Sequence, residues 1–319
     1  MIHVPMIFPG QASQAVGMAT DLMTGTGPAA EYLSGIDDIL QYDLSQLMRD
    51  GPVEILTETW NAQPAILAHS VAVALELREM GILPSVVAGH SLGEYSAAVA
   101  AGALAPDSAL RLVRRRGELM FAAGQRIPGT MAAVLGLDAD TVEQVCQTVT
   151  AKHGVVVVAN SNTTTQIAIS GEVAAVAAAC IALKEAGARR AIPLNVSGAF
   201  HSPLLEHAAR EFSAHLDETE ISGAECPLIA NVTAASAQTP AELKSGFHAQ
   251  LTSPVRWHEI MTNLCQGGAG LPKAEVVLEV GPGRVLTNMA KREFPQVEFI
   301  PVGTREDLET VLDKIGGSG

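Results

Sequence analysis

The most constraining feature of the sequence is a serine between two glycines, Gly89-His90-Ser91-Leu92-Gly93, where an apolar run gives way to a helix-like run. A serine at such a strand-to-helix turn is typical of a nucleophile elbow, in which strained backbone torsions hold the Oγ atom clear of the sheet. Side chains at positions 89 and 93 would collide with the turn, which explains the glycines. The following helix turns free N–H groups toward Ser91, where they can bind an oxyanion. By itself the pattern is only moderately specific, because a plain turn with an incidental serine has the same letters.

A serine hydroxyl becomes a good nucleophile only when a base takes its proton. We expect this base to be His201, in the loop Gly198-Ala199-Phe200-His201-Ser202-Pro203, although a single histidine is more often structural. In ordinary α/β-hydrolases a carboxylate lies between the serine and the histidine in the sequence. No acidic residue between Ser91 and His201 stands in a convincing loop, which argues against a standard esterase. A neutral acceptor, such as a main-chain carbonyl, could orient the imidazole instead.

Arg116 is the next singular residue. Within the run Arg114-Arg115-Arg116, only Arg116 is in helical register with Leu112 and Met120, so we expect it on the apolar stripe of a helix. A buried arginine needs an anion, and its planar guanidinium can hold a carboxylate through two parallel hydrogen bonds. The periodicity leaves two anions equally open, a carboxylate of the substrate and one of the protein. Gly117 beside it allows another backbone to approach closely.

Length, composition and charge exclude several classes of protein. The chain has 319 residues, 48% of them hydrophobic, which suffices for a sizeable core. No apolar run approaches the ~20 residues that span a bilayer, and the start, MIHVPMIFPGQ, lacks the basic segment of a signal peptide. The net charge of −14, without a basic stripe, argues against a nucleic-acid partner. We expect a cytoplasmic monomer that has no membrane partner and no metal site, with buried cysteine fillers at Cys146, Cys180, Cys226 and Cys265.

The order of the predicted elements indicates an α/β fold with an insertion. Residues 1–126 and 198–319 predict a discontinuous large subdomain with a mostly parallel sheet, including the strands His3–Phe8, Ser85–Ala88, Leu228–Val232 and Val276–Val280 and the helices Gln63–Met80, Asp107–Ala123 and Arg284–Arg292. Residues 127–197 predict the order β-α-β-β-α-β of a small ferredoxin-like subdomain. A cleft between the two is a natural substrate site. Gly281-Pro282-Gly283 is better read as a plain turn than as a phosphate-binding loop, and the final GGSG as a flexible tail.

Four segments together resemble the acyltransferase family of malonyl-CoA:acyl carrier protein transacylases. They are Phe8-Pro9-Gly10-Gln11-Ala12-Ser13-Gln14, the string GHSLGEYSA, Arg116-Gly117 and Gly198-Ala199-Phe200-His201-Ser202-Pro203. Two later segments, Gln250 with Ser253-Pro254-Val255-Arg256-Trp257 and Glu279-Val280-Gly281-Pro282-Gly283, also match. The resemblance covers nearly the whole chain in the family's order, and it implies a hydrolase-like core with a ferredoxin-like insertion.

The resemblance also implies a reaction and its residues. Ser91 is the nucleophile that carries the malonyl group, and His201 is its general base and acid. The backbone N–H groups of Gln11 and Leu92 form the oxyanion hole, and Arg116 binds the free carboxylate of malonyl-CoA. After CoA leaves, the phosphopantetheine thiol of holo-acyl carrier protein takes the malonyl group, and no metal or organic cofactor takes part.

Further positions refine this expectation. The carbonyl of Gln250 is implied to orient the catalytic histidine, and Phe200 and Met120 to line the acyl pocket. The family associates phenylalanine before this histidine with malonyl use, because its ring takes the space of an α-methyl group. One departure is visible, since members usually have glycine where this chain has Ala12. If that glycine uses a positive φ, Ala12 is strained; if it only avoids crowding, one methyl group is tolerated.

Three alternatives stay open at this stage. The same transfer could serve a polyketide synthase carrier or a malonate decarboxylase carrier. A serine hydrolase of carboxylated acyl esters is disfavoured, because no persuasive acidic triad member is present. A catalytically silent carrier-binding protein is disfavoured too, because every expected catalytic residue is present.

The docking site of an acidic carrier protein poses a problem of charge. Long-range repulsion from a chain of charge −14 means that docking needs a local basic patch near the cleft. Two sets of residues are candidates, although each could equally be ordinary solvated charge: Arg189 with Arg190, and Arg284 with Lys291 and Arg292.

Overall fold

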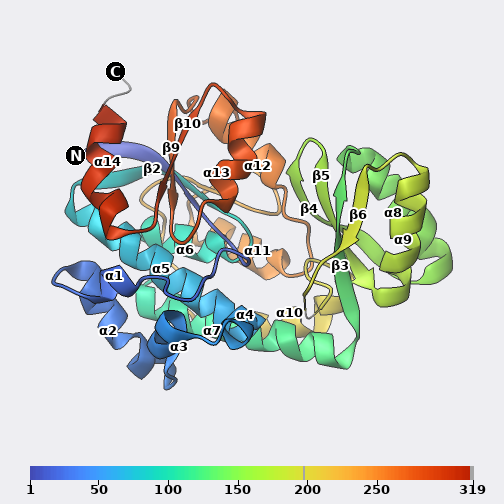
Figure 1. Cartoon of the computed structure of the whole chain (residues 1–319), viewed down its shortest axis with the longest axis horizontal. Helices are drawn as coiled ribbons and strands as arrows, with labels where there is room; N and C mark the ends of the chain where they lie inside the picture. Colours follow the sequence, from blue (N-terminus) through green and yellow to red (C-terminus); the bar gives the residue numbers. More distant parts are fainter. Residues whose placement is uncertain (197, 317–319) are drawn as a thin grey trace.

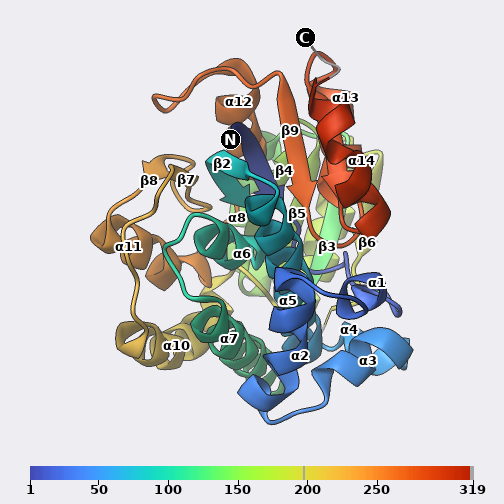
Figure 2. The same cartoon turned by 90° about the vertical axis from the view of Figure 1, so that its left-hand side faces the viewer.

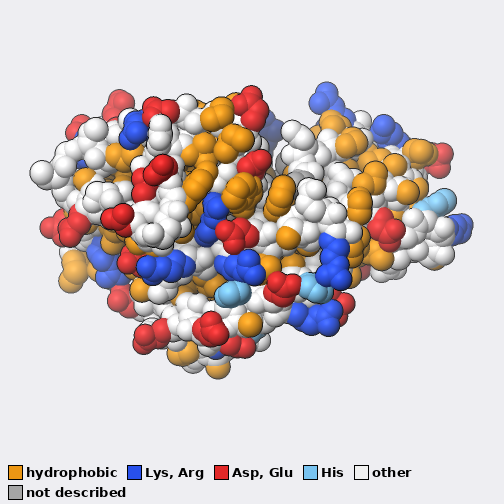
Figure 3. All heavy atoms as spheres, turned by 90° about the horizontal axis from the view of Figure 1, so that it is seen from below, with side chains coloured by type: hydrophobic (Ala, Val, Ile, Leu, Met, Phe, Trp, Pro, Cys, Tyr) orange, Lys and Arg blue, Asp and Glu red, His pale blue; other side chains and the backbone are white. Residues whose placement is uncertain are grey.

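Two parts with separate sheets make up the computed structural model, which describes residues 1–196 and 198–316 (Figure 1). The smaller part, at the right of Figure 1, is formed by the middle of the sequence, and the start of the chain and its last described helix lie at the far side of the larger part. In Figure 3 a notch in the outline separates the two parts. Residues 317–319, in the expected tail, lie outside the described residues. No helix of the described ranges is long and apolar enough to cross a membrane.

The larger part is built on a six-stranded sheet with the order β10-β9-β1-β2-β7-β8. Every neighbouring pair is parallel except β7 and β8, so the predicted mostly parallel sheet is confirmed. The strands are β1 (Ile2–Phe8), β2 (Ile82–Gly89), β7 (Leu228–Ile229), β8 (Ser236–Ala237), β9 (Val276–Val280) and β10 (Glu298–Val302).

Helices cover both faces of this sheet (Figure 2). Alternate side chains of β1 point to opposite faces, so Met6 and Phe8 join the core on the side of α5, whereas Ile7 joins the core on the side of α12 and α13. The helices of this part are α1 (Thr20–Met23), α2 (Pro28–Leu40), α3 (Leu44–Asp50), α4 (Val53–Thr57), α5 (Thr59–Glu79), α6 (Gly93–Ala100), α7 (Pro106–Arg126), the 3₁₀ helix η1 (Pro203–Leu205), α10 (Glu206–Glu218), α11 (Pro240–Gln250), α12 (Trp257–Gln266), α13 (Val285–Glu293) and α14 (Arg305–Gly316).

The smaller part has its own antiparallel sheet, in the order β4-β5-β3-β6, and its own core. Its elements follow the predicted β-α-β-β-α-β order: β3 (Gly129–Leu135), α8 (Ala139–His153), β4 (Val156–Thr163), β5 (Gln166–Glu172), α9 (Val173–Glu185) and β6 (Arg190–Pro193). The fold class expected from the sequence is therefore confirmed. The subdomain boundaries near residues 126 and 198 stay a prediction.

A close contact between α5 and α7 sets the position of the site. Gly117 of α7 faces the first turn of α5, where an added Cβ would lie 2.7 Å from Trp60 Cα and 2.8 Å from the carbonyl oxygen of Thr59. Only glycine allows the two backbones to come so near. Because of this approach, Gln63 on α5 reaches Arg116 on α7.

Replacing Gly117 tests this packing. We expect Gly117→Ala to lower the free energy of unfolding by about 1–3 kcal/mol, because the methyl group overpacks the contact. Gly35→Ala is the matched control, since Gly35 lies within α2 with open space around its Cα, and there alanine should stabilise the helix by up to about 1 kcal/mol. Urea unfolding of both variants measures the difference. Equal changes at the two positions would contradict the close approach.

Candidate active site

The predicted elbow is present between β2 and α6. Ser91 has a φ of 51°, in the left-handed region that strains any residue with a Cβ. A Cβ at position 89 would lie 1.9 Å from the carbonyl carbon of Gly93, and one at position 93 would lie 2.1 Å from the carbonyl oxygen of Phe8. The turn therefore needs both glycines, as expected from the sequence.

The hydroxyl of Ser91 is in direct contact with the imidazole of His201. Ser91 Oγ lies 2.8 Å from His201 Nε2. On the other side of the ring, Nδ1 lies 3.0 Å from the carbonyl oxygen of Gln250 and 3.2 Å from that of Ser253. Carbonyl oxygens only accept hydrogen bonds, so Nδ1 carries the proton and Nε2 has the lone pair that faces the serine. Main-chain carbonyls thus stand where a hydrolase has its carboxylate.

The imidazole is held in its neutral form. Burial, and then the nearby positive charge of Arg116, lower the pKa of His201 to about 3. The hydrogen bonds from Nδ1 to the carbonyl oxygens act in the opposite direction. At neutral pH the ring is therefore ready to accept a proton from Ser91.

Arg116 is buried beside the same hydroxyl, with 1% of its surface exposed. Its guanidinium donates to Gln63 Oε1 at 2.7 Å, to Gln250 Oε1 at 2.9 Å and to Ser91 Oγ at 3.2 Å. All three acceptors are neutral, and no carboxylate of the described residues forms an ion pair with Arg116. Of the two anions that the sequence left open, the arrangement favours one supplied by a ligand.

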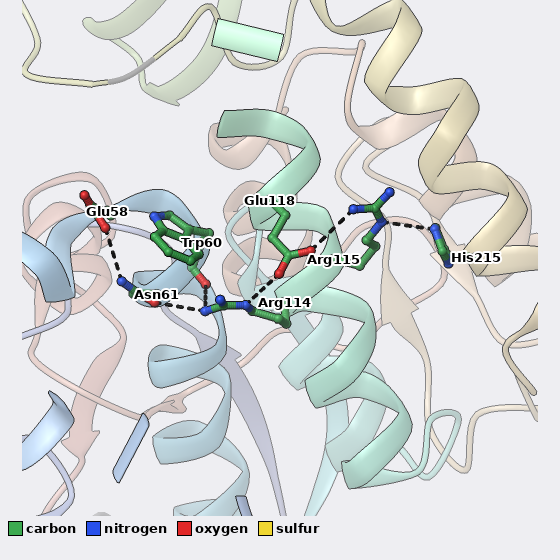
Figure 4. A network of polar contacts seen from close by, with 7 residues as sticks. All are labelled: Glu58, Trp60, Asn61, Arg114, Arg115, Glu118 and His215. Atoms are coloured by element: carbon green, nitrogen blue, oxygen red, sulfur yellow. Dashed lines mark hydrogen bonds and ion pairs between the residues drawn. The ribbon is translucent and has the colours of Figure 1, made fainter. Parts of the chain in front are cut away.

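The two neighbouring arginines have a different environment (Figure 4). Arg114 lies over the Trp60 ring, 4.5 Å from its centroid, and donates to Trp60 O, Asn61 Oδ1 and Glu118 Oε1. Arg115 is more exposed and also pairs with Glu118. Arg114 therefore ties α7 to the first turn of α5, the turn that precedes Gln63.

A cavity of about 350 Å³ opens at the serine. The expected oxyanion residues Gln11 and Leu92 line it, as do the expected acyl-pocket residues Phe200 and Met120. Within residues 1–196 and 198–316, the backbone N–H groups of Gln11 and Leu92 donate to no protein acceptor. They remain available to a ligand oxygen beside Ser91. All eight residues expected at the site therefore lie around one cavity or directly support it: Gln11, Ser91, Leu92, Arg116, Met120, Phe200, His201 and Gln250.

Two buried residues of the site were not singled out from the sequence. Asn231 accepts from the backbone N–H of Ser91 at 2.8 Å and donates to the carbonyl oxygen of Gly89 at 2.7 Å, so its amide braces the elbow. Glu94 accepts from the backbone N–H of Asn231 at 2.9 Å and from Gln250 Nε2. A polar residue just after a parallel strand is a signal that could have found Asn231. Glu94 lies within the GHSLGEYSA string itself.

Two other sequence features are explained by structural contacts. His90 lies in the elbow but reaches Asn162, with 2.9 Å between His90 Nε2 and Asn162 Oδ1, so it turns away from the serine as expected. After the Gly281-Pro282-Gly283 turn, the carboxylate of Glu279 accepts from the first N–H groups of α13, those of Leu286 and Thr287. This helix start binds the protein's own carboxylate, which agrees with a plain turn.

The Ala12 backbone decides between the two readings of its departure from glycine. Its φ is 84°, so Ala12 is strained, by about 1–2 kcal/mol for a left-handed residue with a Cβ. We expect Ala12→Gly to leave the free energy of unfolding unchanged or to raise it by up to about 1 kcal/mol, because relief of strain offsets the added entropy of the unfolded chain. The control Ala177→Gly, at an exposed position inside α9, should lose about 0.5–1 kcal/mol. Equal losses in thermal unfolding would mean that Ala12 is not strained.

Comparison with known proteins places this arrangement in a family. Residues 6–307 match the acyl transferase domain. The malonyl CoA-acyl carrier protein transacylase of Bacillus subtilis is 41% identical over 315 residues, covering 99% of this chain and 98% of the relative. The crystal structure of an acyl carrier protein S-malonyltransferase from Vibrio cholerae is 39% identical with a TM-score of 0.90, covering 96% of this chain and 99% of that one. A complex of a type II polyketide synthase acyl-carrier protein with its malonyl-transacylase matches at 38% identity and a TM-score of 0.90, covering 98% and 99%. The chain therefore belongs to the acyl transferase family, and within it to the malonyl CoA-acyl carrier protein transacylases.

Proposed function

We propose that this enzyme transfers a malonyl group from malonyl-CoA to the phosphopantetheine thiol of holo-acyl carrier protein, through a malonyl ester of Ser91. The observation that carries the proposal is the placement of a buried, unpaired arginine beside an activated serine. Arg116 Nη2 lies 3.2 Å from Ser91 Oγ, and His201 Nε2 lies 2.8 Å from the same atom. A substrate held by a carboxylate on Arg116 brings its thioester carbon to the nucleophile.

In the first half-reaction, Ser91 Oγ attacks the thioester carbon while His201 Nε2 takes the hydroxyl proton. The N–H groups of Gln11 and Leu92 stabilise the oxyanion that forms. When the carbon–sulfur bond breaks, His201 gives its proton to the CoA sulfur. In the second half-reaction, the same imidazole takes the proton of the carrier thiol and returns it to Ser91 Oγ as the ester breaks.

The substrate carboxylate also acts on the base. The charge of Arg116 is one of the two main causes that lower the pKa of His201. A malonyl carboxylate on the guanidinium offsets this charge, so the pKa of the histidine rises when the right substrate is bound. Acetyl-CoA has no carboxylate and leaves the base weak. Phe200 and Met120 are both buried in the cavity wall, and we propose that the Phe200 ring takes the space of an α-methyl group.

Supporting residues for both half-reactions come from one chain, so we propose that the enzyme works as a monomer, in the cytoplasm and without a metal or organic cofactor. We assign the reaction to fatty acid biosynthesis. A polyketide carrier is the alternative partner, because one similar structure is a complex with such a carrier. A hydrolase is disfavoured because carbonyls, not a carboxylate, hold the histidine.

A hollow between the two parts supports a docking site for the carrier. It has a volume of about 800 Å³, and its lining includes Arg189, Arg190 and Arg292 beside the apolar Val285 and Met289. Members of both sets of cations expected from the sequence therefore meet there, although Arg284 and Lys291 are not in its lining. Glu293 also lines the hollow, whereas on the face in Figure 3 acidic and basic side chains are interspersed. We propose that this hollow binds the acidic surface of the carrier.

Removal of the nucleophile and of the base tests the chemistry. We expect Ser91→Ala to slow CoA release by at least about 10³-fold, because no ester can form. His201→Ala should slow both half-reactions, because one imidazole serves each. Rapid-quench measurement of CoA release, followed by transfer to holo-carrier, separates the steps. Normal CoA release from Ser91→Ala would remove this serine from the mechanism.

Arg116→Ala should change the acyl preference. It deletes the charge-assisted contact with the malonyl carboxylate, worth roughly 2–5 kcal/mol when desolvated, so kcat/KM for malonyl-CoA should fall at least about 30-fold. Acetyl-CoA should lose little. Arg115→Ala, one residue away on α7 and outside the cavity lining, is the control and should change neither substrate. Equal losses for both substrates in Arg116→Ala would show that the arginine is only structural.

Charge reversal tests the docking hollow. Arg190→Glu and Arg292→Glu should each raise KM for the carrier and leave KM for malonyl-CoA unchanged, with the larger effect at low salt, where screening is weakest. Arg49→Glu makes the same charge change on α3, outside the hollow lining, and should have a much smaller effect. If the hollow variants behave like Arg49→Glu, the carrier docks elsewhere.

A further inference from the structure

Glu94 is a buried carboxylate that the proposed chemistry does not use. It lies in the first turn of α6, directly after the elbow, with 1% of its surface exposed. Its Oε1 accepts from the backbone N–H of Asn231 at 2.9 Å, and its Oε2 accepts from Gln250 Nε2. Both carboxylate oxygens therefore face donors. Burial of a charged carboxylate is costly unless hydrogen bonds or an opposite charge compensate it, so the position of Glu94 calls for an explanation.

The side-chain amide of Gln250 connects this carboxylate to the site. Its Nε2 donates to Glu94 and, at 3.0 Å, to the carbonyl oxygen of Ser91. Its Oε1 accepts from Arg116 Nη2 at 2.9 Å. An amide has one donor end and one acceptor end. Its orientation here depends on two acceptors on one side and a cation on the other.

We propose that Glu94 is a positioning residue for the malonyl carboxylate site: its ionised carboxylate fixes the Gln250 amide with Oε1 toward Arg116, and so holds the guanidinium beside Ser91. The proposal rests on the role of Arg116 in the proposed function. It assigns to Glu94 a control of acyl preference rather than a part in proton transfer.

Loss of the negative charge of Glu94 should reverse the orientation of the Gln250 side-chain amide. A protonated Glu94 has one O–H, which must face either the backbone N–H of Asn231 or the amide of Gln250. The backbone N–H cannot turn, so the O–H faces Gln250, which must then present Oε1 to it. The Nε2 group of Gln250 would then point at Arg116, donor against donor. A glutamine at position 94 has the same effect, because it also presents a donor on one side.

The surroundings favour titration of Glu94 near neutral pH. Burial raises the pKa of Glu94 to about 7, against the lowering effect of the Asn231 and Gln250 hydrogen bonds and of the charge of Arg116. The other titratable groups of this network stay in one form there. Burial together with the charge of Arg116 lowers the pKa of His201 to about 3, and burial lowers the pKa of His90 and raises that of Tyr95. As pH falls through 7, protonation of Glu94 should therefore weaken use of malonyl-CoA, and not that of acetyl-CoA.

The test compares Glu94→Gln with the wild-type enzyme between pH 5.5 and 8.5, as kcat/KM for malonyl-CoA and for acetyl-CoA. For the wild type, we expect the malonyl-to-acetyl ratio to fall as pH falls through about 7, the region in which a group of this pKa takes up its proton. For Glu94→Gln, the ratio should be lower at pH 8 by roughly tenfold or more, the loss of one hydrogen bond to a charged group, and it should no longer depend on pH. In an Arg116→Ala background, Glu94→Gln should have no further effect on the ratio.

The outcomes separate this proposal from the function on which it rests. If Arg116→Ala leaves the acyl preference unchanged, the proposed role of Arg116 fails. If Arg116→Ala changes the preference but Glu94→Gln keeps the wild-type ratio and its pH dependence, only the role of Glu94 is wrong. An equal loss for both acyl groups, which persists without Arg116, would make Glu94 a structural residue of the elbow. Should Glu94→Gln fail to fold, a wild-type ratio that stays constant from pH 8.5 down to the pH at which the enzyme unfolds overturns the proposal by itself.

Discussion

The site depends on one unusual arrangement, a buried positive charge that forms no ion pair with a carboxylate of the described residues. Arg116 is almost fully enclosed, and its direct acceptors are two side-chain amides and a hydroxyl. Burial lowers its pKa from the ordinary arginine value, yet a guanidinium keeps its proton in proteins. We propose that this buried charge is the site that the malonyl carboxylate of the substrate completes. Burial and then this same charge lower the pKa of His201, so in the proposed reaction recognition of the acyl group is linked to the strength of the base.

Strand topology brings the parts of this arrangement together. In a parallel sheet the carboxyl ends of neighbouring strands meet at one edge. Gln11 follows β1, Ser91 follows β2 and Asn231 follows β7, and these three strands are neighbours. The loop of Gln11, the serine of the elbow and the amide that braces the elbow therefore lie side by side. The helix pair α5 and α7 then supplies Arg116 and its acceptor from one face, through the contact at Gly117.

Much of this was predictable from local sequence. The elbow needs glycines for steric reasons that hold in any fold, and the register of Arg116 with apolar neighbours follows from the helix repeat. The roles of Gln11 and Gln250 came only from the family resemblance, because backbone N–H and carbonyl groups leave no residue signature. The predicted strand Leu228–Val232 ends at Ile229 instead, since Asn231 turns to bind the elbow. Glu94 and Gln63 were missed, because their importance arises from partners far away in the sequence.

The measurement that tests the central claim most directly is the location of the malonyl group in a single turnover. The enzyme is mixed with malonyl-CoA in the absence of carrier, its intact mass is recorded, and the modified peptide is identified after digestion. The account predicts one malonyl adduct on Ser91, which moves to the carrier when holo-acyl carrier protein is added. An adduct on another residue, or transfer that occurs only when malonyl-CoA and carrier are present together, would contradict it.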